Sequence, residues 1–193
     1  AVKKISGYIT KKVSARLEEL FKADRKEFEQ KWDDIKIFIE YGMLTDEKFY
    51  DAAGKFFLLR DISDRYYTLE EYRTLVEATQ TDKDGDVVYL YATDRTAQYS
   101  YSRGAEEKGY NVLLLDGQLD QHLIQMLESK LGKSRFVRVD SDTPERLIRK
   151  QDEKNADVSP LQADLLTGIF RSQIPAIDNT NFIVEYNSLS AGD

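Results

Sequence analysis

The stretch from Asp86 to Asp140 constrains the fold more than any other part of the sequence. It contains three short segments rich in β-branched, aromatic and leucine residues: DVVYLYATD, GYNVLLLDG and SRFVRVD. Segments of helix length separate them, from about Asp94 to Lys108 and from about Leu119 to Leu131. Strands that alternate with helices in this way form a parallel sheet with crossover helices. The sequence therefore predicts a β-α-β-α-β unit.

The turn after the first predicted strand is where many folds of this type bind a cofactor phosphate. Here it reads Ala92-Thr93-Asp94-Arg95-Thr96-Ala97, with no glycine and with an acidic residue where a phosphate would lie. Phosphate binding at such a turn requires close approach of the backbone and an electropositive helix N-terminus. The turn therefore argues against a nucleotide site, although the fold is one that many enzymes share.

The first third of the chain carries apolar residues at helical spacing. Three stripes predict three amphipathic helices: Ile9, Val13, Leu17 and Leu20; Phe28, Trp32, Ile35 and Ile39; and Phe49, Ala52, Ala53 and Phe56. Asp24 is a candidate N-cap of the second helix, Gly42 a candidate end of it, and Thr45 a candidate N-cap of the third. Because such helices need one another to bury their stripes, we expect a three-helix coil over residues 1–66.

Residues 67–149 are predicted to form a small three-layer (αβα) subdomain. Thr68 and Glu71 have the spacing of a capping box, and Tyr67 can pack on Tyr72 as a hydrophobic staple. The class expected for the chain is thus α/β, a coil of helices followed by the three-layer unit.

The C-terminal part differs from the rest of the chain in its composition and in its apolar pattern. Residues 150–158 are polar and lack an apolar period, which predicts a linker. Ser159-Pro160 can begin a helix, and alternating apolar residues over Asn181–Ser188 predict a strand. We interpret residues 159–193 as the truncated start of a further α+β domain. Since the chain also begins at Ala-Val without Met, it has the appearance of a piece of a longer protein.

Composition excludes several classes of protein. The 193 residues carry a formal net charge of −7, so nucleic acid is disfavoured as a partner, because phosphate binding requires clustered Lys and Arg. The chain has no cysteine, which excludes disulfides and thiolate metal sites. No apolar run approaches the roughly 20 residues of a membrane span.

Three motifs resemble functional sites but lack residues that those sites require. Gly132-Lys133-Ser134 matches the end of a P-loop, but Leu127 occupies the position of the first glycine. The acidic run Asp82–Asp86 lacks the glycine and the glutamate of a calcium loop. His122 is the single histidine and has no nucleophile motif to accompany it. We therefore expect that none of these three motifs binds phosphate, binds a metal or takes part in catalysis. Trp32, which lies on an apolar stripe, is expected to be a core residue.

Over nearly its whole length the sequence resembles the heat-shock protein 90 chaperone family, and a bacterial member in particular. The resemblance lies in ITKKVSARLEELFKADRKEFEQKWDDI, YGMLTDEKFYDAAGKFFLLR, YYTLEEYRTLVEATQ and VVYLYATD, and it continues through KGYNVLLLDGQLDQHLIQMLESKLGKSRFVRVDSD. The tail LLTGIFRSQIPAIDNTNFIVEYNSLS resembles the opening of that family's C-terminal domain.

The resemblance implies a parent chaperone with an ATPase domain, a middle domain and a dimerisation domain. ATP and magnesium would bind upstream of this chain, and a catalytic arginine would lie just before residues that resemble Lys3-Lys4-Ile5. We therefore expect no catalytic residue, no metal and no cofactor in this piece. Unfolded or partly folded client proteins are the implied partners, without nucleic acid or membrane. The parent is expected to be a cytoplasmic homodimer, and the piece a monomer.

The resemblance also indicates where clients would bind. In this family the helix after the second strand commonly opens with Ile-Asp-Glu and an aromatic residue, whereas here it opens with Leu119-Asp120-Gln121-His122. The predicted client surface consists of the residues at the start of that helix: Leu119, Gln121, His122, Gln125 and Met126. The simpler, bland interpretation is that Leu119, Leu123 and Met126 face the sheet, and that His122 and the two glutamines are ordinary surface. The alternative function is a freestanding α/β enzyme or small-ligand domain, which the fold alone supports.

Overall fold

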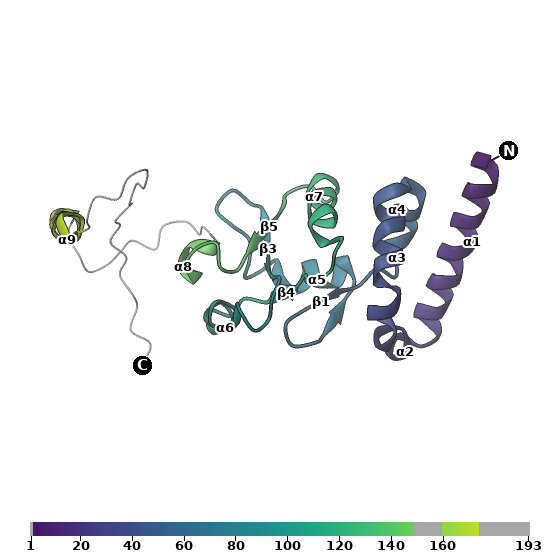
Figure 1. Ribbon diagram of the computed structural model, residues 1–193, viewed down its shortest axis with the longest axis horizontal. Coiled ribbons are helices and arrows are strands. Elements are labelled where there is room, and N and C mark those ends of the chain that lie inside the picture. Colours follow the sequence, from purple (N-terminus) through teal and green to yellow (C-terminus); the bar gives the residue numbers. More distant parts are fainter. Residues whose placement is uncertain (1, 149–159, 174–193) are drawn as a thin grey trace. The chain divides into compact units, whose positions relative to one another are not determined.

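The computed structural model describes residues 2–148 and 160–173. The chain divides into two compact units, Ala1–Lys150 and Gln151–Asp193. Figure 1 shows that the first unit begins with four neighbouring helices: α1 (Val2–Ala23), α2 (Arg25–Gln30), α3 (Trp32–Thr45) and α4 (Glu47–Ala53).

The helical coil thus has four helices where the sequence predicts three, because the second predicted helix is interrupted at Lys31. Asp24 caps α2 as predicted, since its side chain accepts a hydrogen bond from the backbone N–H of Glu27. The backbone N–H of Lys31 closes the last turn of α2, and α3 begins at the next residue. The predicted apolar stripe continues across this break, with Phe28 and Trp32 both buried.

The sequence predicts that α3 ends at Gly42 and that Thr45 caps α4, and both predictions are wrong. Gly42 lies inside α3, where a β-carbon would come within 2.8 Å of the Phe49 ring, so this glycine permits close packing of α3 on α4. The hydroxyl of Thr45 donates to the Tyr41 carbonyl and caps nothing. Instead Asp46 caps α4 by accepting a hydrogen bond from the backbone N–H of Phe49.

The apolar stripe predicted for the first helix is largely uncovered in the part of α1 whose side chains are described. Ile9 and Val13 are 55% and 47% exposed, and only Leu17 of the stripe packs against the core. The helix contacts α4 instead through a face that includes Thr10, whose hydroxyl donates to the Asp46 carboxylate at 3.0 Å. The spacing predicted the helix correctly but misplaced its buried face.

A short hairpin connects the helices to the sheet. Strand β1 (Leu59–Arg60) pairs antiparallel with β2 (Tyr66–Tyr67), and α5 (Leu69–Val76) begins directly after it. The capping box predicted at Thr68 and Glu71 is confirmed, with both of its hydrogen bonds present. The staple is also present, because the Tyr67 and Tyr72 ring centroids lie 5.6 Å apart.

The β-α-β-α-β unit is confirmed. It consists of β3 (Val87–Ala92), α6 (Tyr99–Glu107), β4 (Val112–Leu114), α7 (Asp120–Lys130) and β5 (Ser134–Arg138), followed by α8 (Pro144–Leu147). The three strands are parallel, and β3 lies between β4 and β5.

The sheet is covered on both faces. Val87 and Tyr89 of β3 belong to a buried cluster with residues of α3, α4, α5 and α7. Val88 and Leu90 alternate with them and belong to a second buried cluster with residues of α6 and α8. Since successive residues of a strand point to opposite faces, the two clusters lie on opposite sides of the sheet. The three-layer αβα architecture and the α/β class are therefore confirmed.

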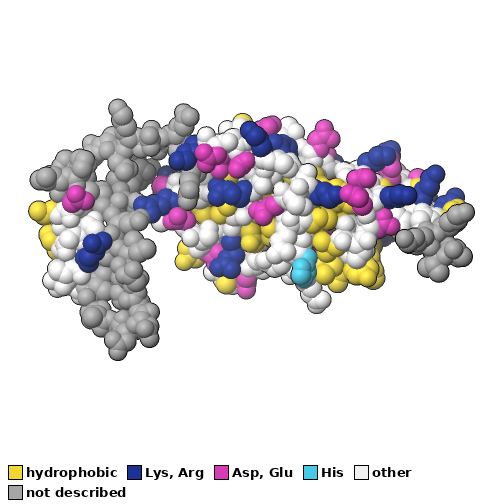
Figure 2. All heavy atoms as spheres, turned by 90° about the horizontal axis from the view of Figure 1, so that it is seen from above, with side chains coloured by type: hydrophobic (Ala, Val, Ile, Leu, Met, Phe, Trp, Pro, Cys, Tyr) yellow, Lys and Arg dark blue, Asp and Glu magenta, His cyan; other side chains and the backbone are white. Residues whose placement is uncertain are grey.

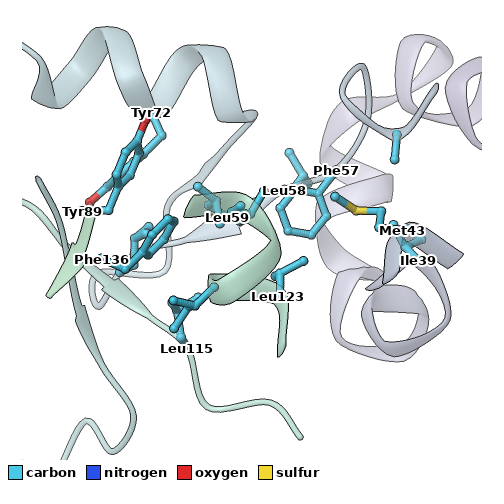
Figure 3. Packing of buried hydrophobic residues seen from close by; sticks show 14 of the residues in the cluster. Ile39, Met43, Phe57, Leu58, Leu59, Tyr72, Tyr89, Leu115, Leu123 and Phe136 are labelled. Carbon is cyan, nitrogen blue, oxygen red and sulfur yellow. The ribbon is translucent and has the colours of Figure 1, made fainter. Parts of the chain in front are cut away.

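Residues 56–59 lead from the end of the helical coil into β1 and are almost completely buried. The exposed fractions are 0%, 1%, 1% and 2% for Phe56, Phe57, Leu58 and Leu59. Phe57 meets Trp32 of α3 edge to face, with ring centroids 5.6 Å apart. Figure 3 shows Phe57 on the side of Met43 and Leu59 on the side of Phe136. One core therefore serves the helices and one face of the sheet.

The second unit contributes one described helix, α9 (Pro160–Gln173). Its exposed apolar residues include Leu165, Ile169 and Phe170. The linker predicted at 150–158, the N-cap predicted at Ser159 and the strand predicted at 181–188 lie outside the described residues.

The capping box of α5 provides a first prediction. The Thr68 side chain accepts from the Glu71 N–H at 3.2 Å, and Glu71 also pairs with Arg25 of α2. Replacing Thr68 with Ala should lower the free energy of unfolding by about 1 kcal/mol, the usual cost of losing an N-cap. The matched control is Thr74→Ala in the same helix, where the exposed hydroxyl donates only to the Glu70 carbonyl. Urea denaturation should show less than about 0.5 kcal/mol for the control, and equal losses in the two variants would contradict the assignment.

Candidate functional site

The turn after β3 is closed to a phosphate by the chain's own side chains. Gln98 Oε1 accepts hydrogen bonds from the backbone N–H groups of Thr93 and Asp94, at 2.7 and 3.0 Å. Asp94 Oδ1 accepts from the N–H groups of Thr96 and Ala97, both at 2.9 Å. These are donors that a bound phosphate would use. The same contacts form a separate turn, which is why α6 begins at Tyr99 and not at Asp94.

The other two motifs are structural turns. Gly132 and Lys133 both have positive φ, 45° and 48°, and lead from α7 into β5, the reverse of the strand-to-helix order of a P-loop. Asp82 Oδ1 accepts the backbone N–H groups of Asp84 and Asp86, and its other oxygen binds Arg135. This carboxylate therefore already has partners from the chain itself.

A metal site and a membrane-spanning helix are both absent from the residues that the structure describes. Within residues 2–148 and 160–173 there is no cluster of three or more His, Cys, Asp or Glu side chains that could hold a metal ion. In the same ranges no helix combines the length and the apolarity that a membrane span requires.

The predicted client surface lies at the start of α7, and Asp120 fixes this corner. The Asp120 side chain is buried, and its Oδ2 accepts a hydrogen bond from the Gly117 N–H at 2.7 Å. The same oxygen accepts from Lys36 Nζ of α3 at 3.0 Å. A carboxylate at a helix N-terminus is favoured by the helix dipole. Asp120 therefore anchors the first turn of α7 to the loop before it and to α3.

The five predicted client residues divide into two groups. Gln121, His122 and Gln125 are exposed, whereas Leu119 and Met126 are half-buried. The fully apolar face of α7 points into the core, and its buried residues are Leu123, Ile124 and Leu127. The structure thus brings the five residues to one corner, as a polar surface with apolar edges. The apolar part of the bland interpretation holds for Leu123 and in part for Met126, which packs against the core.

Helix α3 adds exposed apolar residues that the sequence analysis did not include in the surface. It packs beside α7, and Ile37, Phe38 and Tyr41 are 42%, 75% and 63% exposed. Figure 2 shows hydrophobic side chains gathered beside the chain's single histidine. The sequence holds a signal for these residues, because they fall between the members of the buried stripe and are nevertheless apolar.

Arg60 supplies a second ionic contact between the elements around this corner. It binds Asp33 of α3 at 3.0 Å and Asp116, in the loop before α7, at 3.4 Å. Its side chain is 17% exposed, and burial opposes its charge while Asp33 and Asp116 raise its pKa. The corner is consequently held by two cations, Lys36 and Arg60, each of which meets an acid on α3 and another near the start of α7.

Comparison with known proteins gives strong sequence matches. The chain is 56% identical over 190 residues to the chaperone protein HtpG of Porphyromonas gingivalis, and 54% identical over 188 residues to that of Bacteroides thetaiotaomicron. The matches cover 98% and 97% of this chain but 28% of each relative. The chain thus spans little more than a quarter of the length of these relatives. No protein-family model matches the chain.

A solved structure gives the same fold at low sequence identity. It is the middle domain of a Plasmodium falciparum heat shock protein, with a TM-score of 0.57 and 16% identity. The match covers 72% of this chain and 58% of that domain.

The occupied turn after β3 generates a prediction about nucleotides. Millimolar ATP or ADP, with or without Mg²⁺, should leave the melting temperature of the 193-residue chain unchanged, because the backbone donors of the turn are already bonded within the chain. A ligand at a hundred times its dissociation constant would stabilise the chain by about 2.7 kcal/mol, which differential scanning fluorimetry resolves easily. A saturable rise of the melting temperature that Gln98→Ala alters would contradict the prediction.

Proposed function

Since the chain belongs to the heat-shock protein 90 family, as a segment of its bacterial HtpG members, we propose that it is the client-binding middle region of an ATP-dependent chaperone. Unfolded or partly folded proteins are the proposed partners. The surface that binds them is the corner at the start of α7, formed by Leu119, Gln121, His122, Gln125 and Met126.

The observation that carries this proposal is the mixed character of that corner. Exposed Gln121, His122 and Gln125 lie between half-buried apolar residues, and the neighbouring helix α3 exposes Phe38 and Tyr41. Unfolded chains present apolar side chains together with unpaired backbone groups, so a surface that binds many of them requires both kinds of contact. A broad surface of this kind suits a polypeptide better than a small molecule.

The second part of the proposal is that this segment performs no chemistry of its own. The self-occupied turn after β3 supports this part, because it removes the usual phosphate site of the fold. ATP and magnesium are proposed to bind elsewhere in the parent, in parts of the relatives outside the 28% that this chain spans. We place the parent in the cytoplasm as a homodimer, and the isolated segment in solution as a monomer.

A mechanical role accompanies the binding role. The core shared by α3, α7 and the sheet supports the view that the helical coil and the αβα unit move as one body. Such a body can transmit movement from an ATPase domain to a client held at α7.

The alternative of a freestanding α/β enzyme or small-ligand domain is supported by the fold alone. The nucleotide titration above distinguishes the two functions for nucleotide ligands, because a small-ligand domain of that kind would be stabilised.

Substitution at the corner tests the binding proposal. The double variant His122→Ala with Gln125→Ala should weaken binding of a reduced, carboxymethylated unfolded protein by about fivefold, or about 1 kcal/mol. Its melting temperature should stay nearly unchanged, because both side chains are exposed. His122→Trp should strengthen binding, since an aromatic side chain adds buried area at an interface. Fluorescence anisotropy of the labelled unfolded protein measures each affinity.

The control is Gln30→Ala, which removes a glutamine that is also exposed, from α2. It should bind the unfolded protein like the wild-type chain. If the double variant and His122→Trp both bind with unchanged affinity, the corner at α7 is not the client surface.

A further inference from the structure

The junction of α3 and α7 contains three ionisable side chains that are largely withdrawn from water. Glu40 and Asp120 each expose 2% of their side chain, and Lys36 exposes 15%. Lys36 Nζ lies 3.0 Å from Asp120 Oδ2 and 3.6 Å from Glu40 Oε1. Two carboxyl groups therefore meet one ammonium group in a site with little solvent.

Each of the two carboxyl groups has one buried oxygen that lacks a hydrogen-bond donor. Asp120 Oδ2 accepts from Lys36 and from the Gly117 N–H. Within the part of the chain that the structure describes, Asp120 Oδ1 and Glu40 Oε1 are buried and have no hydrogen-bond partner. Buried polar atoms are nearly always bonded, so two such oxygens in contacting residues require an explanation.

The charge balance of the site also argues against ionisation of both acids. If both acids were ionised, the cluster would hold one uncompensated negative charge in the interior, which is strongly unfavourable. The next cation, Arg60, borders the same small cavity as Lys36 and Glu40. It is already paired with Asp33 and Asp116, so it does not balance Glu40.

We propose that Glu40 holds a proton and donates it to the free oxygen of Asp120, so that one shared proton joins α3 to α7. The carboxylic acid of Glu40, the carboxylate of Asp120 and the ammonium of Lys36 then form a neutral group. One O–H···O bond satisfies both unpartnered oxygens at once. A protonated acid can donate where a carboxylate can only accept.

The pKa of Glu40 supports this arrangement. Burial raises it from its ordinary 4.5 to about 8, Lys36 opposes the rise, and the charge of Asp120 and its hydrogen bond to Glu40 add to it. The groups that act on Glu40 come from its own helix and from α7, while Arg60 of β1 faces the same cavity. At neutral pH the acid is accordingly protonated in the folded chain.

A pH dependence of stability follows from this raised pKa. Between the ordinary value of 4.5 and about 8, the folded chain retains a proton that the unfolded chain has released. Stability from this contact is therefore complete at low pH and decreases as pH rises through that window. This sign is opposite to that of an acid that is ionised and ion-paired in the fold.

The test compares the wild-type chain with Glu40→Gln, which keeps the shape and can donate an N–H to Asp120 at every pH. Urea denaturation would be measured between about pH 5 and pH 9. The ratio of the wild-type unfolding constant to that of Glu40→Gln should rise with pH. The expected rise is up to about tenfold per pH unit below pH 8, followed by a plateau. The matched control is Glu19→Gln on α1, which removes a carboxyl group that is 67% exposed and should give a profile parallel to the wild type.

A second measurement needs no variant that folds. Carbon-13 labelling of glutamate carboxyl groups in the wild-type chain should reveal one resonance that titrates near pH 8. The proposal is overturned if no glutamate resonance titrates above about pH 6. It is equally overturned if the wild type gains stability over Glu40→Gln as pH rises, because Glu40 is then ionised and paired with Lys36.

Discussion

The rest of the structure depends on the burial of residues 56–59 between the helical coil and the sheet. Phe57 packs edge to face on Trp32, and the same cluster continues through Leu123 of α7 to Phe136 of β5. Each fully buried side chain of this size contributes about 1.5–3 kcal/mol, whereas an exposed ion pair contributes about 0–1 kcal/mol. The apolar segment, and not the many surface salt bridges, therefore sets how the four helices lie on the αβα unit.

This shared core also determines what α7 presents to solvent. Because Leu123 and Leu127 are committed to the core, His122 and Gln125 point outward. Asp120 and its contact with Lys36 then fix where the helix begins. The corner that we propose for client binding is thus anchored to the shared core, and the exposed aromatic residues of α3 lie on a helix that packs beside it.

The sequence predicted the parts of this structure that depend on local chemistry. The alternating strands, the Thr68–Glu71 capping box and the Asp24 cap were correct because they need only near neighbours. The sequence-based predictions failed where tertiary contacts determine the role of a residue. The sequence predicts a helix end at Gly42, although this glycine lies inside α3 and admits the Phe49 ring. The partnership of Lys36 with Asp120 joins residues 84 positions apart, and no spacing rule predicts it. The family resemblance located the corner, and the geometry supplied its anchoring and its neighbours on α3.

The central claim, that this segment binds unfolded polypeptide at the start of α7, is tested most directly by hydrogen–deuterium exchange. The exchange of the 193-residue chain would be followed by mass spectrometry with and without a saturating unfolded protein. The account predicts that added protection is concentrated in peptides covering residues 117–130 and the adjoining surface of α3. Protection confined to the turn at residues 93–98, or no change at α7 when the unfolded protein is demonstrably bound, would contradict it.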